Sequence, residues 1–137
     1  MATVNITLVV QVSGGPTINV SRNIDVEAYD KIDVDIEPNG KIKTIEVQPT
    51  TDQKRISFLL ITSSLYSSSS NNIKLTYGTD KADKIELDQP HFYLGSGVVS
   101  LLGSDLKNLQ FQNTSDNDPK NKAALQILVG RHPIASS

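Results

Sequence analysis

The chain has 137 residues, no cysteine, and a formal net charge of −2 from thirteen basic and fifteen acidic residues that alternate along it. A chain of this length forms one domain and buries roughly 65–70% of its unfolded surface, so it needs no disulfide or structural metal to fold. The composition excludes thiol catalysis, zinc fingers and iron–sulfur clusters, and the absence of a basic stripe argues against nucleic-acid binding. We therefore expect a single domain over residues 1–137.

The first segment alternates apolar and mostly polar residues. In an extended chain, alternate residues point to one face, so the pattern predicts a strand with one apolar side. Ser13-Gly14-Gly15-Pro16 ends it as a turn, because glycine permits positive φ and proline removes a ladder donor. The alternating residues are Val4, Ile6, Leu8, Val10 and Val12.

The clearest alternation comes at residues 32–37, where isoleucines and a valine are separated by acidic residues. Pro38-Asn39-Gly40 follows, and Asn-Gly is the strongest short signal for a hairpin turn. The pattern predicts a hairpin whose return strand begins at Ile42.

Later segments are more apolar than a strand with one solvated face requires. Phe58-Leu59-Leu60-Ile61 leaves no polar side, which is typical of a central strand covered on both faces. Residues 98–102 and 125–129 also carry a second apolar face. Such a face must be covered, and in a small domain a neighbouring subunit is a natural candidate.

The whole chain reads as about nine or ten short strands with no substantial helix. Amphipathic segments with a 3.6-residue period are missing. Many short strands joined by turns predict an all-β fold, specifically an antiparallel, jelly-roll-like β-sandwich, with a closed barrel as the alternative.

Catalytic motifs are weak. His91 and His132 are too isolated to share a metal, and neither lies in a known ligand spacing. Gly95-Ser96-Gly97 lacks the flanking residues of a nucleophile elbow and is better explained as a tight turn. We therefore expect no enzymatic activity and no cofactor.

Two acidic groups are the candidate binding sites. Asp33, Asp35 and Glu37 would share one strand face, and paired carboxylates serve glycosidases and calcium sites, but a solvated face is the favoured interpretation. Asp116, Asn117 and Asp118 place three oxygen-bearing side chains in one loop and form a weak calcium candidate. They lack the glycine and glutamate of an EF-hand loop, so a plain Asx turn is favoured.

No targeting or spanning segment is visible. The longest apolar run has four residues, whereas a spanning helix needs about 20. The first residues show no positive region ahead of an apolar stretch, so we expect a cytoplasmic location.

These features favour a structural or assembly subunit that self-associates, of the kind found in virion shells and phage tails. The comparison rests on fold-level analogy alone. The alternative is a small module that binds carbohydrate or calcium; a jelly-roll hydrolase or isomerase is a third reading, disfavoured by the two isolated histidines. The predicted interface residues are Val98, Val99, Leu101, Leu102 and Leu128.

Overall fold

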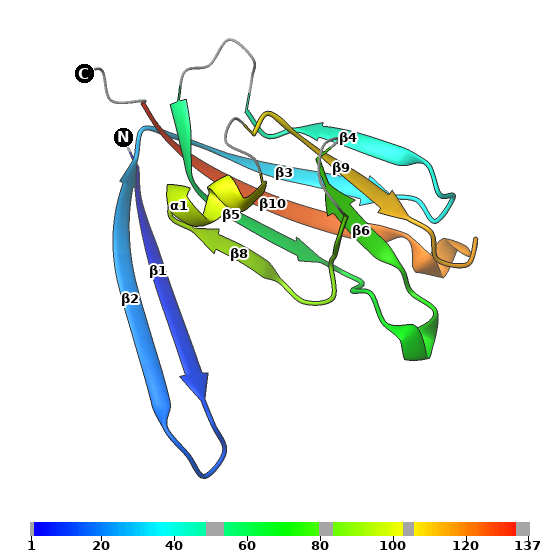
Figure 1. Cartoon of the computed structure of the whole chain (residues 1–137), viewed down its shortest axis with the longest axis horizontal. Helices are drawn as coiled ribbons and strands as arrows, with labels where there is room; N and C mark the ends of the chain where they lie inside the picture. The colour runs from blue at the N-terminus through cyan, green and yellow to red at the C-terminus, as the bar shows by residue number, and fades with distance from the viewer. Residues whose placement is uncertain (1, 49–53, 80–83, 103–105, 134–137) are drawn as a thin grey trace.

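The computed structural model describes residues 2–48, 54–79, 84–102 and 106–133, and these form three antiparallel sheets (Figure 1). A hairpin is made by β1 (Ala2–Gln11) and β2 (Thr17–Val26). The sheet termed here the long sheet has the order β3 (Ala28–Ile36), β10 (Ala123–Pro133), β5 (Lys54–Ser63) and β8 (His91–Leu94). The short sheet has the order β4 (Ile42–Glu46), β9 (Asn108–Asn113), β6 (Leu75–Gly78) and β7 (Ile85–Glu86).

The long and short sheets pack face to face and share one core. Alternate residues of each strand point inward, as the period-two pattern predicts. Leu59 and Ile127 of the long sheet are buried in one cluster with Leu75 and Phe111 of the short sheet. Burying a side chain of this kind contributes about 1.5–3 kcal/mol. The prediction of an all-β, antiparallel sandwich is confirmed.

The predicted hairpin at Asn39-Gly40 is wrong. β3 pairs with β10 in the long sheet and β4 pairs with β9 in the short sheet, so this turn carries the chain from one sheet to the other. A type I′ hairpin turn needs positive φ at both central residues, but only Gly40 has it, at 74°. The Asn39 side chain instead accepts a hydrogen bond from Lys41 N (2.9 Å), which makes an Asx turn.

Residues 98–102 are helical rather than a strand. Gly95 adopts a φ of 96°, and α1 (Ser96–Val99) and η2 (Ser100–Leu102) follow it directly. The two remaining short helices are η1 (Ser69–Asn71) and η3 (Pro119–Asn121). The glycine turn was predicted, but the short helix after it was not, because one turn of helix leaves too few residues for a 3.6-residue period to show. In the described part of the chain, no helix has the length and apolar character needed to span a membrane.

Candidate functional site

The β1–β2 hairpin has one face that is almost entirely apolar. Its register pairs Val4 with Ile24 and Leu8 with Val20, so the alternating apolar residues of both strands lie on the same side. The opposite face pairs Asn5 with Asn23 and is polar except for Val9. Residues 2–26 are termed the arm below. Its apolar face consists of Ala2, Val4, Ile6, Leu8, Val10, Ile18, Val20, Ile24 and Val26, with Arg22 as the single charged member.

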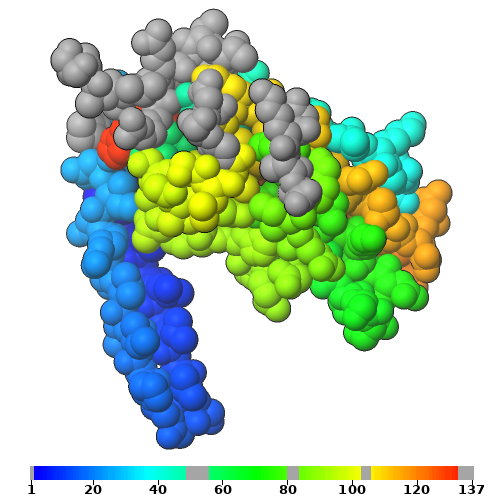
Figure 2. Space-filling view, viewed as in Figure 1, coloured from blue at the N-terminus to red at the C-terminus, as the bar shows by residue number. Residues whose placement is uncertain are grey.

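The apolar face of the arm becomes more exposed from root to tip. Val26 is fully buried at the root, whereas Leu8, Val10 and Ile18 near the tip are 51%, 48% and 60% exposed. The arm stands away from the sandwich in the space-filling view (Figure 2). A two-stranded hairpin is marginally stable in water by itself, and a contiguous exposed apolar surface marks an interaction site. The arm is therefore the leading candidate for a binding surface.

The root of the arm is fixed to the sandwich. Between β2 and β3 the chain bends at Glu27, whose N–H donates to the Arg131 carbonyl over 3.0 Å. The buried Arg131 guanidinium donates from Nη1 to Asp30 Oδ2 (2.7 Å) and from Nη2 to the Val47 carbonyl. These bonds tie β10 to the start of β3 and to the end of β4. They fix the segment that joins the arm to the sandwich.

The outer face of the long sheet has an apolar end and a polar end. At the apolar end, Phe92 is exposed and packs edge-on against Phe58, with ring centroids 6.3 Å apart. Leu60 and Leu128 lie directly beside Phe92 and are half-buried. The polar end holds an open hollow of about 480 Å³. Its outward-facing lining residues are Asp33, Asp35, Thr62, Ser64, Ala124 and Gln126.

The strand carboxylates are solvent-exposed, as favoured from the sequence. Asp33 lies 3.6 Å from the Lys31 ammonium, and Asp35 lies 3.7 Å from that of Lys122. Their side chains are 63% and 55% exposed. A general acid needs burial to raise its pKa, and neither carboxylate is buried.

The loop proposed for calcium uses its oxygens internally. Asp118 Oδ1 accepts from Lys120 N (3.0 Å) and caps η3, while its Oδ2 lies 3.9 Å from the Lys120 ammonium. The Asp116 carbonyl accepts from Asn121 Nδ2 (2.8 Å), and Asn117 is exposed. This is the Asx-type turn favoured from the sequence. Among the described residues, no three His, Cys, Asp or Glu side chains are grouped so that they could hold a metal ion.

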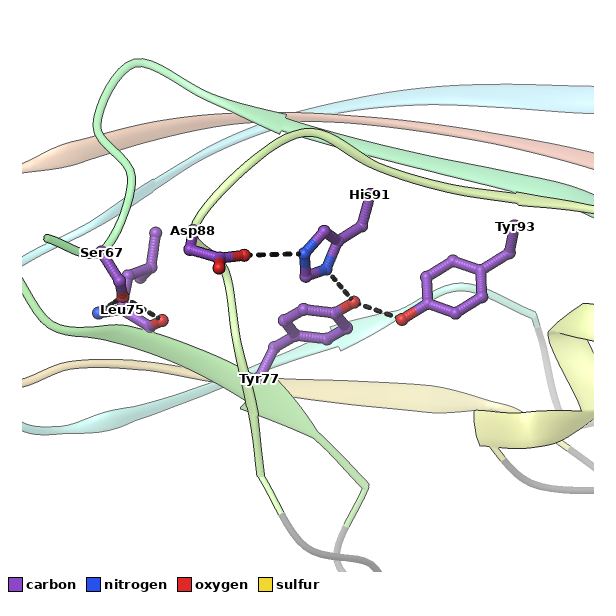
Figure 3. Close-up of polar contacts among 6 residues, drawn as sticks. All are labelled: Ser67, Leu75, Tyr77, Asp88, His91 and Tyr93. Carbon is purple, nitrogen blue, oxygen red and sulfur yellow. Dashed lines mark hydrogen bonds and ion pairs between the residues drawn. The ribbon is translucent and has the colours of Figure 1, made fainter.

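A second polar group lies between the sheets, at their open side (Figure 3). The Tyr77 hydroxyl bonds to His91 Nδ1 (2.7 Å) and to the Tyr93 hydroxyl, and His91 Nε2 lies 3.3 Å from Asp88 Oδ1. Burial, reinforced by the Tyr93 hydrogen bond, raises the pKa of Tyr77 above its usual range. The shift favours the protonated form of Tyr77. The chain of hydrogen bonds ties β8 of the long sheet to β6 of the short sheet.

His132, which was predicted to have no metal-binding role, lies within β10 and is half-buried. Sequence reasoning also did not link His91 to Tyr77 and Asp88, because the contact between the sheets is set by packing.

The predicted interface residues are divided by the helical geometry of residues 98–102. Val98 and Leu101 are exposed, whereas Val99 and Leu102 belong to the core. Leu128 lies on the outer face of the long sheet, as a second apolar face requires.

The arm itself was missed as an interaction surface. A signal was present: two ten-residue segments of the same periodicity flank the Gly14-Gly15 turn. Their exposure could not be foreseen, because periodicity does not show which element covers an apolar face.

Comparison with protein-family models, with curated proteins and with solved structures gave no significant match.

Proposed function

We propose that this protein is a non-enzymatic assembly subunit that forms homo-oligomers through its arm. The single observation behind the proposal is the apolar face of the arm, which lies outside the core and is exposed over its distal half. Burying a valine or isoleucine side chain contributes about 1.5–3 kcal/mol, so several such residues supply enough free energy for association. The virion- or phage-tail-like role remains part of this proposal by analogy only.

The ligand-binding alternative has less support. The hollow beside Asp33 and Asp35 is open, and both carboxylates are solvent-exposed. In the 116–118 loop, the Asp118 carboxylate and the Asp116 carbonyl already accept hydrogen bonds from neighbouring N–H groups. Aromatic platforms for sugar stacking are also scarce, since the chain has no tryptophan.

The test is solution molar mass, measured by size-exclusion chromatography with light scattering over a range of micromolar concentrations. The wild-type chain is expected to run well above the 14.9 kDa of one copy. The variant Val10→Thr changes the apolar face and is expected to weaken association, because threonine keeps β-propensity but carries a hydroxyl into the contact. Adding Ile18→Thr, the cross-strand partner of Val10, is expected to produce a monomer.

The matched control is Val9→Thr, the same substitution one residue earlier and on the opposite face, where Val9 is similarly exposed. It is expected to leave the mass unchanged. A wild-type monomer at high concentration would contradict the proposal, and so would equal effects of the Val9 and Val10 substitutions. Far-ultraviolet circular dichroism of each variant verifies that the strands are retained.

A further inference from the structure

The arm cannot cover the apolar surface of its own sandwich. It leaves the sandwich at the bend after β2 and runs away from the two packed sheets (Figure 1). The bend is held by the Glu27–Arg131 hydrogen bond and the buried Arg131 guanidinium. In one copy, the distal half of the arm and the part of the outer face of the long sheet around Phe92 are therefore left without a covering layer.

We infer that the arm of one copy lies on the outer face of the long sheet of a second copy, and that the exchange is reciprocal across a two-fold axis. This inference rests on the proposed self-assembly and names its partner surface. The arm then acts as a third β-layer on the sandwich of its neighbour, packed as aligned sheets pack.

The two surfaces match row by row along the strands. Arg22 pairs with Ile6 at the middle of the arm, and the Leu8–Val20 pair lies two residues nearer the tip. On the receiving sheet, Gln126 pairs with Asp33 and Thr62, and Leu128 lies two residues further along β10. Both steps are about 7 Å, since a strand rises about 3.3 Å per residue.

Placing Arg22 over the Gln126 row brings Leu8 and Val20 over the row that contains Leu128, Leu60 and Phe92. The tip pair, Val10 and Ile18, then lies over the next row, in which Phe58 is already buried and the accessible side chains are those of Tyr29 and Leu94. The polar residue of the arm therefore meets the polar end of the receiving sheet, and the apolar residues meet its apolar end.

Charge supports the same register. Arg22 is the one charged side chain on the apolar face of the arm, and Asp33 and Asp35 border the hollow at the polar end of the receiving face. Their pairs with Lys31 and Lys122 are exposed and long, at 3.6 and 3.7 Å, and such pairs contribute little. A guanidinium can donate two parallel hydrogen bonds to a carboxylate, which an ammonium cannot, and apolar neighbours strengthen such a pair by excluding water.

The size of the arm favours two exchanged arms in each interface. A two-stranded ribbon of ten residues covers about 320 Å², from a rise of about 3.3 Å per residue and a strand spacing of about 4.8 Å. One docked arm therefore buries about 640 Å² counting both surfaces, and stable interfaces bury about 1,200–2,000 Å². Two arms reach that range, and an isologous two-fold contact supplies both at once.

Cross-linking tests the receiving surface directly, because the chain has no native cysteine. Tagged Leu8→Cys protein is mixed with untagged Leu128→Cys protein and treated with a short bifunctional maleimide. A mixed cross-linked species is expected. The control replaces Leu128→Cys with Thr44→Cys, which lies on the exposed outer face of the short sheet, and is expected to give little mixed product.

Charge reversal tests the register. Arg22→Glu is expected to raise the dissociation constant by about tenfold or more, since a like charge then faces Asp33 and Asp35. Mixing Arg22→Glu with Asp33→Lys protein is expected to recover association, because both arm contacts of the mixed dimer then join opposite charges. Arg22→Gln, which removes the charge without reversing it, is expected to have a smaller effect.

The outcomes separate the two proposals. A wild-type monomer would overturn both. An oligomer whose arm cross-links to Thr44→Cys instead would overturn the receiving surface and keep self-assembly. A mass of about three or more copies with the Leu8–Leu128 cross-link would overturn the two-fold arrangement, whereas a mass near twice 14.9 kDa with that cross-link supports the full inference.

Discussion

Gly130 lies beneath the ring of Phe58 on the outer face of the long sheet, and its replacement by alanine tests the packing described there. A Cβ atom at residue 130 would lie 2.2 Å from Phe58 Cε1 and 2.8 Å from Cζ. Real Cβ contacts are not this short, so the ring must move. Phe58 is only 1% exposed and packs edge-on against Phe92, which limits where the ring can go.

Two effects of opposite sign decide the free energy of unfolding. Gly130 does not have a positive φ, so alanine fits its backbone and should stabilise by about 0.4–1 kcal/mol through the unfolded chain. Displacing a packed side chain costs about 1–3 kcal/mol. The cost of displacing the Phe58 ring should exceed the gain from the less flexible unfolded chain. We therefore expect Gly130→Ala to destabilise the protein by about 1–2 kcal/mol. For a domain of this size, the melting temperature should fall by about 4–8 °C.

The assay is thermal and urea unfolding followed by circular dichroism, at one protein concentration because oligomers melt in a concentration-dependent way. Phe58→Leu and the double variant complete a double-mutant cycle. With the smaller leucine at position 58, Gly130→Ala should become neutral or slightly stabilising, which gives a coupling energy of about 1–2 kcal/mol. A Gly130→Ala protein at least as stable as wild type, with Phe58 in place, would refute the steric reasoning.

Three further outcomes are expected, each measured by the same unfolding assay. Asn113→Ala should cost about 2–3 kcal/mol, because the buried Asn113 amide donates to the Ile36 and Asn121 carbonyls and its oxygen accepts from Ser115 N. Asn117→Ala, at an exposed site, is the control. An equal loss of stability in the two variants would contradict the prediction. Tyr77→Phe should cost about 1–2 kcal/mol, because the Tyr77 hydroxyl bonds to both His91 and Tyr93. Its cost should exceed that of Tyr93→Phe, and the reverse order would show that the Tyr77 hydroxyl is not the centre of these hydrogen bonds. Millimolar calcium should leave the melting temperature unchanged, since Asp118 already caps η3; a rise of several degrees would point to a calcium site and favour the ligand-binding alternative.

The local sequence pattern was sufficient to predict where several strands and turns lie, but not which strands pair. The alternation over residues 32–36 and the polar turn at 114–119 are both found in the structure. The strands on either side of Asn39-Gly40 were wrongly predicted to pair with each other, because the same residues also suit an Asx turn that crosses between sheets. Pairing over long sequence separation, such as β3 with β10, leaves no local trace in the sequence.

The division of residues 98–102 shows the same limit at the level of single side chains. The segment is apolar throughout, and its apolar character predicted contact but not direction. Once the chain turns helically after Gly95, Val99 and Leu102 fall on the core side and Val98 and Leu101 point outward. A strand would have sorted the same residues differently, because its side chains alternate with a period of two.

The sequence by itself determined that this is an all-β protein without cysteine, whose strands carry apolar residues on alternate positions. It did so because side-chain direction in an extended chain follows from backbone geometry alone. Only the tertiary structure decided which apolar faces are covered. The core rows of both sheets cover one another, while the arm and the outer face of the long sheet do not, because the bend at Glu27 carries the arm away from the sheet to which it is joined.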